Sequence, residues 1–305
     1  MQNNSILIAG SIALDTIEIG NEKYGNLLGG STTYAMLAAG RFVPVHIVGI
    51  IGDDFPRTGH ALFNKYAADL TDLEIQKGKT FSWGGRYHEN FDDRDTLFTD
   101  LGVFGDYKPK LSEINQKHQY IFLANIHPVL QELVIDQSQP DALIVVDTMN
   151  LWITTTLKEL LSVIKKITVL LINESEAIML TKNSNLDEAA KALIALGPNT
   201  IVIKRGSKGA ILYNSSQKKV SIGVYPIKRV ADPTGAGDSF GGGFIAALAQ
   251  GKSYEEALVL GTATASICVE EVGVSGLDKT TISEINHRKK ILQNSLHLEN
   301  QVNFL

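Results

Sequence analysis

The residues best suited to chemistry lie in one glycine-rich segment, residues 232–244, with the sequence Asp-Pro-Thr-Gly-Ala-Gly-Asp-Ser-Phe-Gly-Gly-Gly-Phe. Apolar residues follow it at helical spacing, so Gly235, Ala236 and Gly237 are predicted to lie at the N-terminus of a helix. Free N–H groups and the helix dipole favour an anion there, and small residues let a phosphate approach the backbone. Asp238 would repel that phosphate, but it would suit a base that takes a proton from a hydroxyl attacking a phosphoryl group. The alternative is a first-turn acid that the helix dipole favours.

Three consecutive glycines, Gly241–Gly243, lie within the same predicted helix. Each costs about 1 kcal/mol relative to alanine in a helix interior. We therefore expect this helix to pack unusually close to a neighbouring element.

Two other glycine motifs that bind nucleotides do not match. The dinucleotide-binding pattern Gly-x-Gly-x-x-Gly fails at Phe240, and the segment does not follow a strand at the start of the chain. The P-loop pattern has its tail at Gly251-Lys252-Ser253, but Ala246 stands where its first glycine belongs and lies in mid-helix. A dehydrogenase is therefore the weakest enzyme hypothesis.

Composition narrows the possible partners and cofactors. The 305 residues carry a formal charge of −5, without the basic surface that nucleic acid requires. Cys268 is the only cysteine, which excludes an internal disulfide framework and a multi-cysteine zinc site. The seven histidines show no zinc-like spacing.

Targeting and membrane segments are not expected. Residues 1–5 contain no Lys or Arg, so the charged start of a signal peptide is missing. No apolar run reaches the ~18 residues that span a membrane. The sequence predicts a cytoplasmic protein without a membrane partner.

The elements that must position the glycine-rich segment alternate between strands and helices. The predicted strands are β-branched and continuously apolar, as in sheets covered on both faces: Ile6–Ala9, His46–Ile50, Tyr120–Leu123, Leu143–Val146, Val169–Ile172 and Thr200–Ile203. The predicted helices are Thr32–Arg41, Thr58–Ala67, Pro128–Ile135, Leu157–Ile164, Leu186–Leu196, Ala236–Gln250, Tyr254–Val269 and Thr281–Leu292. This alternation predicts an α/β fold with a mostly parallel sheet.

Two stretches interrupt the alternation. Residues 12–19 alternate apolar and polar, and residues 81–104 combine aromatic and charged residues with a weak strand pattern. Both are typical of half-exposed strands outside the main sheet. An edge hairpin and a lid over a site are equally compatible with them.

The segment Asp232–Phe240 resembles the C-terminal signature of the ribokinase-like (PfkB) carbohydrate and nucleoside kinases. Further landmarks follow the order found in that family: Gly10-Ser11 with Asp15, Gly29-Gly30-Ser31, Gly49-x-x-Gly52-Asp53, Asn173-x-x-Glu176, Lys204-Arg205-Gly206-Ser207-Lys208-Gly209, and residues 264–273. The resemblance runs from about Ile6 to Leu292. It implies a three-layer αβα sandwich as a single domain over residues 1–305, with lid segments at approximately 12–28 and 78–106.

Members of that family transfer the γ-phosphoryl group of ATP to a hydroxyl. The resemblance therefore implies Asp238 as the base, Gly235, Ala236 and Gly237 as the anion hole, and Thr234 near the β- and γ-phosphates. The other residues that it implies for the nucleotide are Asn173, Glu176, Lys204, Ser207 and Gly209. It implies that Asn173, Glu176 and Asp232 act around Mg²⁺, the first two mainly through water, which suits an ion that keeps its hydration shell. Relatives also commonly bind a monovalent cation such as K⁺, through backbone oxygens that a sequence does not reveal.

The resemblance also places the acceptor and a partner. Asp15, Gly29 and Gly30 would contact the substrate, and an aspartate accepts hydrogen bonds from two neighbouring sugar hydroxyls. The alternative for Asp15 is a lid residue that points to solvent. Asn125 follows a central strand at its carboxyl end, where open α/β sheets bind ligands, or it belongs to a plain loop. Many relatives form homodimers through the lid.

Two departures from the family pattern bear on the substrate. Ribokinases proper carry an asparagine where this chain has Tyr34, so ribose is not supported, and the Tyr34 ring would suit stacking on a nucleobase. The segment Asp147-Thr148-Met149-Asn150-Leu151-Trp152 lacks the arginine of the related Asp-x-Asn-x-Arg motif, so a sugar acid would lack its counter-ion. Lid residues Arg86, His88 and Arg94 could supply charge, or lie on a solvated face.

The predicted function is ATP-dependent phosphorylation of a hydroxyl, in particular a hydroxymethyl group, on a sugar or sugar-like molecule. A nucleoside kinase on the same fold is the second hypothesis. A nucleotide- or sugar-binding regulator without transfer activity is the third, and the presence of Asp238, Asn173 and Glu176 argues against it.

Overall fold

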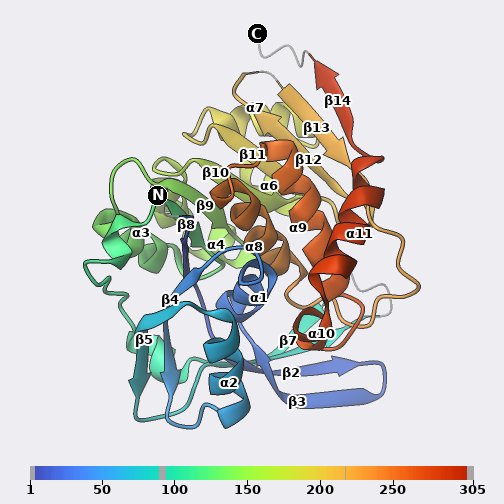
Figure 1. Ribbon diagram of the computed structural model, residues 1–305. Helices are drawn as coiled ribbons and strands as arrows, with labels where there is room; N and C mark the ends of the chain where they lie inside the picture. The colour runs from blue at the N-terminus through green and yellow to red at the C-terminus, as the bar shows by residue number, and fades with distance from the viewer. Residues whose placement is uncertain (1–3, 89–93, 217, 301–305) are drawn as a thin grey trace.

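The computed structural model describes residues 4–88, 94–216 and 218–300 and contains one large central sheet (Figure 1). Its ten strands lie in the order β14 (His297–Asn300), β13 (Lys218–Ile222), β12 (Ala210–Asn214), β11 (Thr200–Lys204), β10 (Val169–Asn173), β9 (Leu143–Asp147), β8 (Tyr120–Leu123), β1 (Ile6–Ala9), β4 (Val45–Gly52) and β5 (Asp69–Gln76). The strands from β11 to β5 pair in parallel, and β12, β13 and β14 pair antiparallel at one edge. The prediction of a mostly parallel sheet is confirmed.

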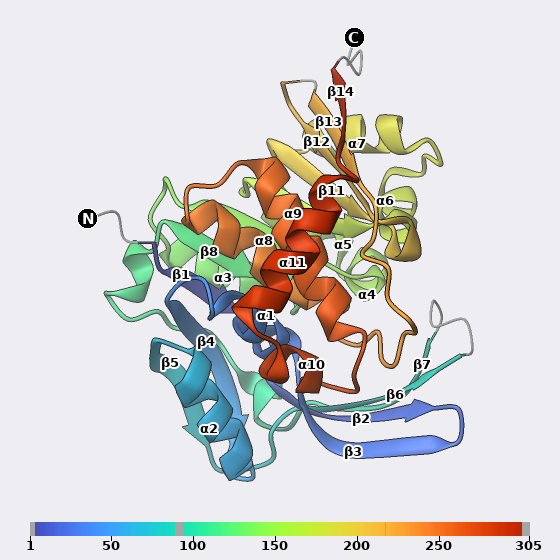
Figure 2. The ribbon, with the colours of Figure 1, turned by 45° about the vertical axis from the view of Figure 1, so that its right-hand side comes forward.

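Helices cover both faces of this sheet, because successive residues of each buried strand point to opposite sides. On strand β1, Ile6 and Ile8 belong to one apolar core, and Leu7 and Ala9 belong to the other. The first core is closed by α1 (Ser31–Ala39), α2 (Arg57–Tyr66), α8 (Ala236–Ala249), α9 (Tyr254–Cys268), α10 (Ser275–Lys279) and α11 (Ile282–Gln293). The second is closed by α3 (Pro128–Gln137), α4 (Asn150–Thr155), α5 (Leu157–Ile164), α6 (Glu174–Thr181) and α7 (Leu186–Ile194). The predicted three-layer αβα sandwich is thus observed (Figures 1 and 2).

The elements that the sequence pattern did not predict lie mainly at the edges. Strand β5 alternates charged and apolar residues, and its half-exposed position at the sheet edge explains that pattern. The hairpin of β12 and β13 and the last strand β14 extend the opposite edge. The short helices α4 and α6 follow strands β9 and β10, in stretches for which the sequence pattern predicted neither a strand nor a helix.

A second, four-stranded sheet stands apart from the main sheet, at the lower right in Figure 2. Its order is β3 (Glu22–Gly29), β2 (Ala13–Ile19), β6 (Ser82–Tyr87) and β7 (Arg94–Asp100). Strands β2, β6 and β7 arise from the two stretches that interrupted the alternation, whereas β3 follows the first of them. Residues 89–93 of the predicted lid segment 78–106 lie outside the described residues. Within the described part of the chain, no helix is both long and apolar enough to cross a membrane.

Helix α8 packs closer to its neighbours than side chains would allow, as its three glycines predicted. A Cβ on Gly241 would lie 2.1 Å from the ring of Phe122, and one on Gly242 would lie 2.3 Å from the carbonyl oxygen of Ala35 in α1. A Cβ on Gly243 would lie 2.4 Å from Oγ1 of Thr264 in α9. The glycines therefore let α8 lie directly against the sheet and both flanking helices.

Replacing Gly242 by alanine tests this packing. Alanine has the better helix propensity, but its methyl group would meet the backbone of α1, so Gly242→Ala should lower the free energy of unfolding by about 1–3 kcal/mol. Gly25→Ala in the exposed strand β3 is the control, because a Cβ at Gly25 would come no closer than 4.0 Å to Oγ1 of Thr16. Urea unfolding of both variants measures the difference, and an unchanged Gly242→Ala would contradict the close approach.

Candidate active site

The first turn of α8 begins at Gly235, which has a left-handed backbone with φ of 76°. A Cβ here would also lie 2.3 Å from the ring of Tyr34, so both conformation and space require glycine. Among the described residues, the N–H groups of Gly235 and Gly237 have no hydrogen-bond acceptor, whereas the N–H of Ala236 donates to the carbonyl of Pro233 at 3.2 Å. Two of the three predicted anion-hole donors are thus unpaired.

Asp238 lies in this first turn and faces several charged groups. Burial raises the pKa of Asp238 to about 7; the Asp147 carboxylate acts in the same direction, and Lys204 and Arg94 oppose it. A carboxylate with a pKa near neutrality is well matched to general-base chemistry. A first-turn acid that the helix dipole favours stays the alternative for Asp238.

Asp15 on strand β2 is the second buried acid of the site, with 5% of its surface exposed. Burial raises the pKa of Asp15 to about 7, the N–H of Gly30 donates to it and lowers the value, and Asp232 and Asp238 raise it further. A Cβ on Gly29 would lie 1.9 Å from Oδ2 of Asp15, so only glycine fits there. The structure therefore brings Asp15, Gly29 and Gly30 together and places Asp15 within electrostatic reach of Asp238.

Asp232 joins two loops of the site through backbone hydrogen bonds. Its side chain is fully buried, and its two carboxylate oxygens accept the backbone N–H groups of Thr234 at 2.9 Å and Gly273 at 2.8 Å. These bonds tie the loop before α8 to the turn after α9. Each carboxylate oxygen can accept a further hydrogen bond, so the prediction that Asp232 acts around Mg²⁺ stays a prediction.

Asn173 and Glu176 form a capping box at the start of α6. The N–H of Glu176 donates to Oδ1 of Asn173 at 2.8 Å, and the N–H of Asn173 donates to Oε2 of Glu176 at 3.0 Å. Burial raises the pKa of Glu176 to about 7, while the Asn173 N–H and Lys204 lower it. In the part of the chain that is described, no three His, Cys, Asp or Glu side chains are grouped as a metal site. The pair therefore fits Mg²⁺ through water and not as a full set of direct ligands.

Lys204 ends strand β11 and lies beside the anion hole. A Cβ on Gly237 would lie 3.1 Å from Nζ of Lys204, which itself donates to both oxygens of Asp147 at 2.7 Å. The next turn exposes Ser207 and closes where the N–H of Arg205 donates to the carbonyl of Gly209 at 2.8 Å. Lys204 and this turn are thus consecutive in the chain and follow the carboxyl end of one strand.

Tyr34 does not offer its ring to a ligand. The side chain is 1% exposed in α1 and packs beneath Gly235. Stacking of Tyr34 on a nucleobase is therefore wrong for this structure, because the ring belongs to the core that supports the anion hole.

Asn125 lies in a polar cluster after strand β8. Its Oδ1 accepts a hydrogen bond from the indole N–H of Trp152 at 2.8 Å, and its amide nitrogen lies 3.1 Å from the sulfur of Met149. The hydroxyl of Ser31 donates a hydrogen bond to the backbone carbonyl of Asn125 at 3.2 Å. Ser31 begins α1 next to Gly30. Asn125 is thus held at the N-terminal end of α1, next to Gly30.

The four-stranded sheet contacts the loop before α8 directly. Oγ1 of Thr234 and the hydroxyl of Tyr87 on strand β6 are hydrogen bonded at 3.0 Å. Arg94 on strand β7 lies 5.4 Å from the ring of Trp83 and lowers the pKa values of Asp15 and Asp238. Sequence analysis did not identify Tyr87 or Asp147 as site residues. For Asp147 a clue existed, since it ends a predicted strand at the same sheet edge as Asn173 and Lys204.

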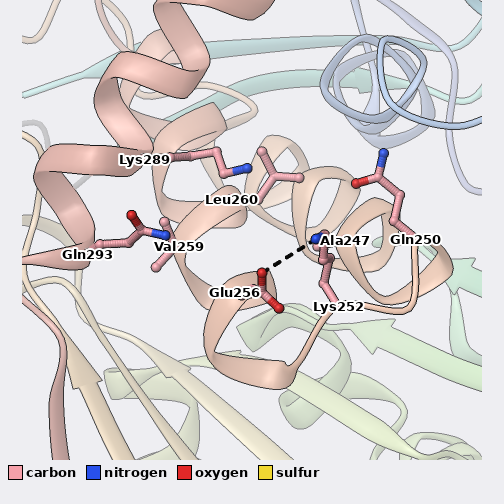
Figure 3. A pocket seen from close by; sticks show the side chains of 8 residues that line it. All are labelled: Ala247, Gln250, Lys252, Glu256, Val259, Leu260, Lys289 and Gln293. Atoms are coloured by element: carbon pink, nitrogen blue, oxygen red, sulfur yellow. Dashed lines mark ion pairs between the residues drawn. The ribbon is translucent and has the colours of Figure 1, made fainter.

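A small cavity of about 60 Å³ lies elsewhere, between the C-terminal part of α8, α9 and α11 (Figure 3). Polar side chains from α9, from α11 and from the turn after α8 surround it, and Lys252 and Glu256 form an ion pair of 3.7 Å at its edge. None of the candidate site residues at the start of α8 lines this cavity, so it is separate from that site.

Comparisons with known proteins identify the family of the chain. The family model for pfkB family carbohydrate kinases matches residues 20–281. The cytidine kinase of Thermococcus kodakarensis is 28% identical over 84% of this chain and 92% of its own, and the ribokinase of Bacillus subtilis is 27% identical over 89% and 95%. A putative ribokinase II from E. coli, solved with ATP and Mg²⁺, superposes with a TM-score of 0.80 at 19% identity over 94% of this chain and 99% of its own. The chain therefore belongs to the pfkB family of carbohydrate kinases.

Proposed function

We propose that this protein transfers the γ-phosphoryl group of ATP to a hydroxyl, in particular a hydroxymethyl group, of a sugar or sugar-like substrate. One observation carries the proposal: the half-buried Asp238 lies in the first turn of α8, beside unpaired backbone N–H groups and the ammonium of Lys204. A base, an anion site and a cation thus meet where a phosphoryl group would be transferred.

The roles of the chain's own residues follow from this arrangement. Asp238 accepts the proton of the attacking hydroxyl, while the N–H groups of Gly235 and Gly237 donate to the transferring phosphoryl group. Asp15 and Gly30 hold neighbouring hydroxyls of the acceptor, and the turn at Ser207 and Gly209 lines the nucleotide. Thr234 lies near the β- and γ-phosphates.

Mg²⁺ accompanies ATP in this proposal, held by the phosphates and by water molecules that contact Asn173 and Glu176. When bound, it would neutralise phosphate charge. A monovalent cation such as K⁺ stays a prediction.

A nucleoside is the second candidate acceptor, favoured by the 28% identity to a cytidine kinase. Its ribose offers the same hydroxyls to Asp15 that a free sugar does, so this contact serves either class. Burial of Tyr34 removes the stacking argument from the sequence, and the comparison alone supports this candidate.

An acceptor panel separates these candidates. We expect the wild-type protein with ATP and Mg²⁺ to release ADP in the presence of at least one member of a panel of pentoses, hexoses, sugar acids and nucleosides. Turnover on nucleosides alone would replace the sugar proposal by the nucleoside candidate. Binding of ATP with no acceptor-stimulated ADP release over the whole panel would identify a regulator and contradict the proposed activity.

Replacing the base should abolish transfer but preserve binding. Asp238→Asn keeps the size of the side chain and removes its proton affinity, so kcat should fall by about 10²- to 10⁴-fold. Nucleotide binding measured by calorimetry should survive. Asp278→Asn, an acid in an ion pair with Lys65 on α2, is the matched control and should keep full activity. Full activity of Asp238→Asn would show that another group is the base.

The rate should depend on pH near neutrality. Burial raises the pKa values of Asp238 and Asp15 to about 7, and Asp238 must be ionised to accept a proton. Activity is therefore present above about pH 7 and is lost as the pH falls below it. Because Asp238 and Asp15 interact, this acid limb of the pH profile reports the two carboxyl groups together. The measurement is kcat/KM between pH 5 and 9 at constant ionic strength, with a control that the protein stays folded. A limb near pH 4 would mean that neither acid is desolvated in solution.

Dimerisation through the four-stranded sheet also stays a prediction. Its outer strand β7 is exposed along its length, with Leu97 and Phe98 among its residues.

A further inference from the structure

The ion pair between Lys204 and Asp147 is a buried charge pair within the proposed site. Nζ of Lys204 lies 2.7 Å from both oxygens of Asp147, and the two side chains are 17% and 5% exposed. Asp147 ends strand β9 and Lys204 ends strand β11, with strand β10 between them. The lysine therefore reaches across the end of one strand to meet its partner.

The ammonium also lies at the electrostatically unfavourable end of a helix. Its Nζ is 3.1 Å from where a Cβ of Gly237 would be, in the first turn of α8, whose dipole repels a cation. Burial lowers the pKa of Lys204, but Asp147, followed by Glu176 and Asp238, raises it above the ordinary value. The lysine is thus charged in a place that only nearby anions make tolerable, and Asp147 is the anion in contact with it.

We propose that Asp147 is a positioning residue that holds the ammonium of Lys204 at the anion hole, where Lys204 contacts the transferring phosphoryl group. This rests on the proposed function. An ammonium has three N–H donors, and two of them point to the oxygens of Asp147, which leaves the third for a phosphate oxygen. Gly237 has no side chain to separate that donor from the helix N-terminus.

The pair also acts on the base, and its two members act in opposite directions. The groups that face Asp238 are Asp15 from β2, Arg94 from β7, Asp147 from β9, Lys204 from β11 and Cys268 from α9. Of the pair, Asp147 raises the pKa of Asp238 and Lys204 lowers it. Removing either charge should therefore move the acid limb of the rate in a direction that identifies which charge was lost.

Two substitutions test the proposal through kcat and the pH dependence of kcat/KM. Lys204→Met should lower kcat about 10²-fold and move the acid limb to higher pH by about half a unit or more. Asp147→Asn should lower kcat about tenfold and move the limb to lower pH by a similar amount. The matched control is the pair of Lys65 and Asp278, also 2.7 Å apart, where Lys65→Met and Asp278→Asn should leave the limb in place.

A binding measurement makes the test independent of turnover. Lys204→Met should weaken ATP binding about tenfold and leave adenosine binding unchanged, because the lost contact is with phosphate. If the wild-type protein turns over no acceptor, the proposed function fails, but this comparison still decides whether Lys204 contacts phosphate. If Asp147→Asn does not fold, the double variant Asp147→Asn/Lys204→Met removes both charges together. It should fold with a limb near that of the wild type and a low kcat.

Three results would overturn the proposal. If the acid limb moves in the same direction in Lys204→Met and Asp147→Asn, or does not move in either, the pair only links two strands. Equal weakening of ATP and adenosine binding by Lys204→Met would remove the phosphate contact. A higher Mg²⁺ requirement in Asp147→Asn, with an unmoved limb, would assign Asp147 to the metal instead of to Lys204.

Discussion

The close approach of α8 to the carboxyl ends of β9 and β11 is the constraint on which the rest of the site depends. Gly241 and Gly242 remove the side chains that would hold the helix away from the sheet and from α1, and Gly237 does the same against Lys204. These glycines lower the intrinsic stability of the helix. The burial of α8 against α1, α9 and the sheet offsets that cost, because packing contributes more to a buried helix than propensity does.

This approach brings unlike charges into a volume with little water. Asp238, Asp147 and Lys204 lie around one helix end, with Glu176 and Asp15 within electrostatic reach. Each acid whose pKa is raised in the folded protein lowers the free energy of unfolding once it ionises. This loss grows from the pKa of the unfolded chain to about pH 7 and is constant above that pH. The site is therefore least stable at the pH where its base is ionised. Such a trade is common where burial activates a catalytic group.

The sequence predicted the parts of the fold whose pattern is local. The continuous apolar runs at Ile6–Ala9 and Tyr120–Leu123 coincide with strands, and the glycines of α8 predicted its close packing. Partners far apart in the chain could not be predicted, because Lys204 and Asp147 are 57 residues apart and meet only when β9 and β11 flank β10. Tyr34 shows the opposite limit: its place after Gly29-Gly30 suited substrate contact, but tertiary packing turned its ring into the core.

The acid proposed to hold the acceptor lies on the four-stranded sheet, whereas the acid proposed as the base lies on a helix that packs against the main sheet. This arrangement links the four-stranded sheet to the proposed chemistry. Asp15 lies on strand β2 of that sheet and Asp238 lies on α8. The negative charge of Asp238 raises the pKa of Asp15. Tyr87 of the same sheet is hydrogen bonded to Thr234, and Arg94 of that sheet lowers the pKa values of both acids. Because these effects require the sheet to cover the site, moving it away would rehydrate both carboxylates and lower their pKa values. The proton affinity of Asp238, the proposed base, thus depends on the position of the four-stranded sheet as well as on α8.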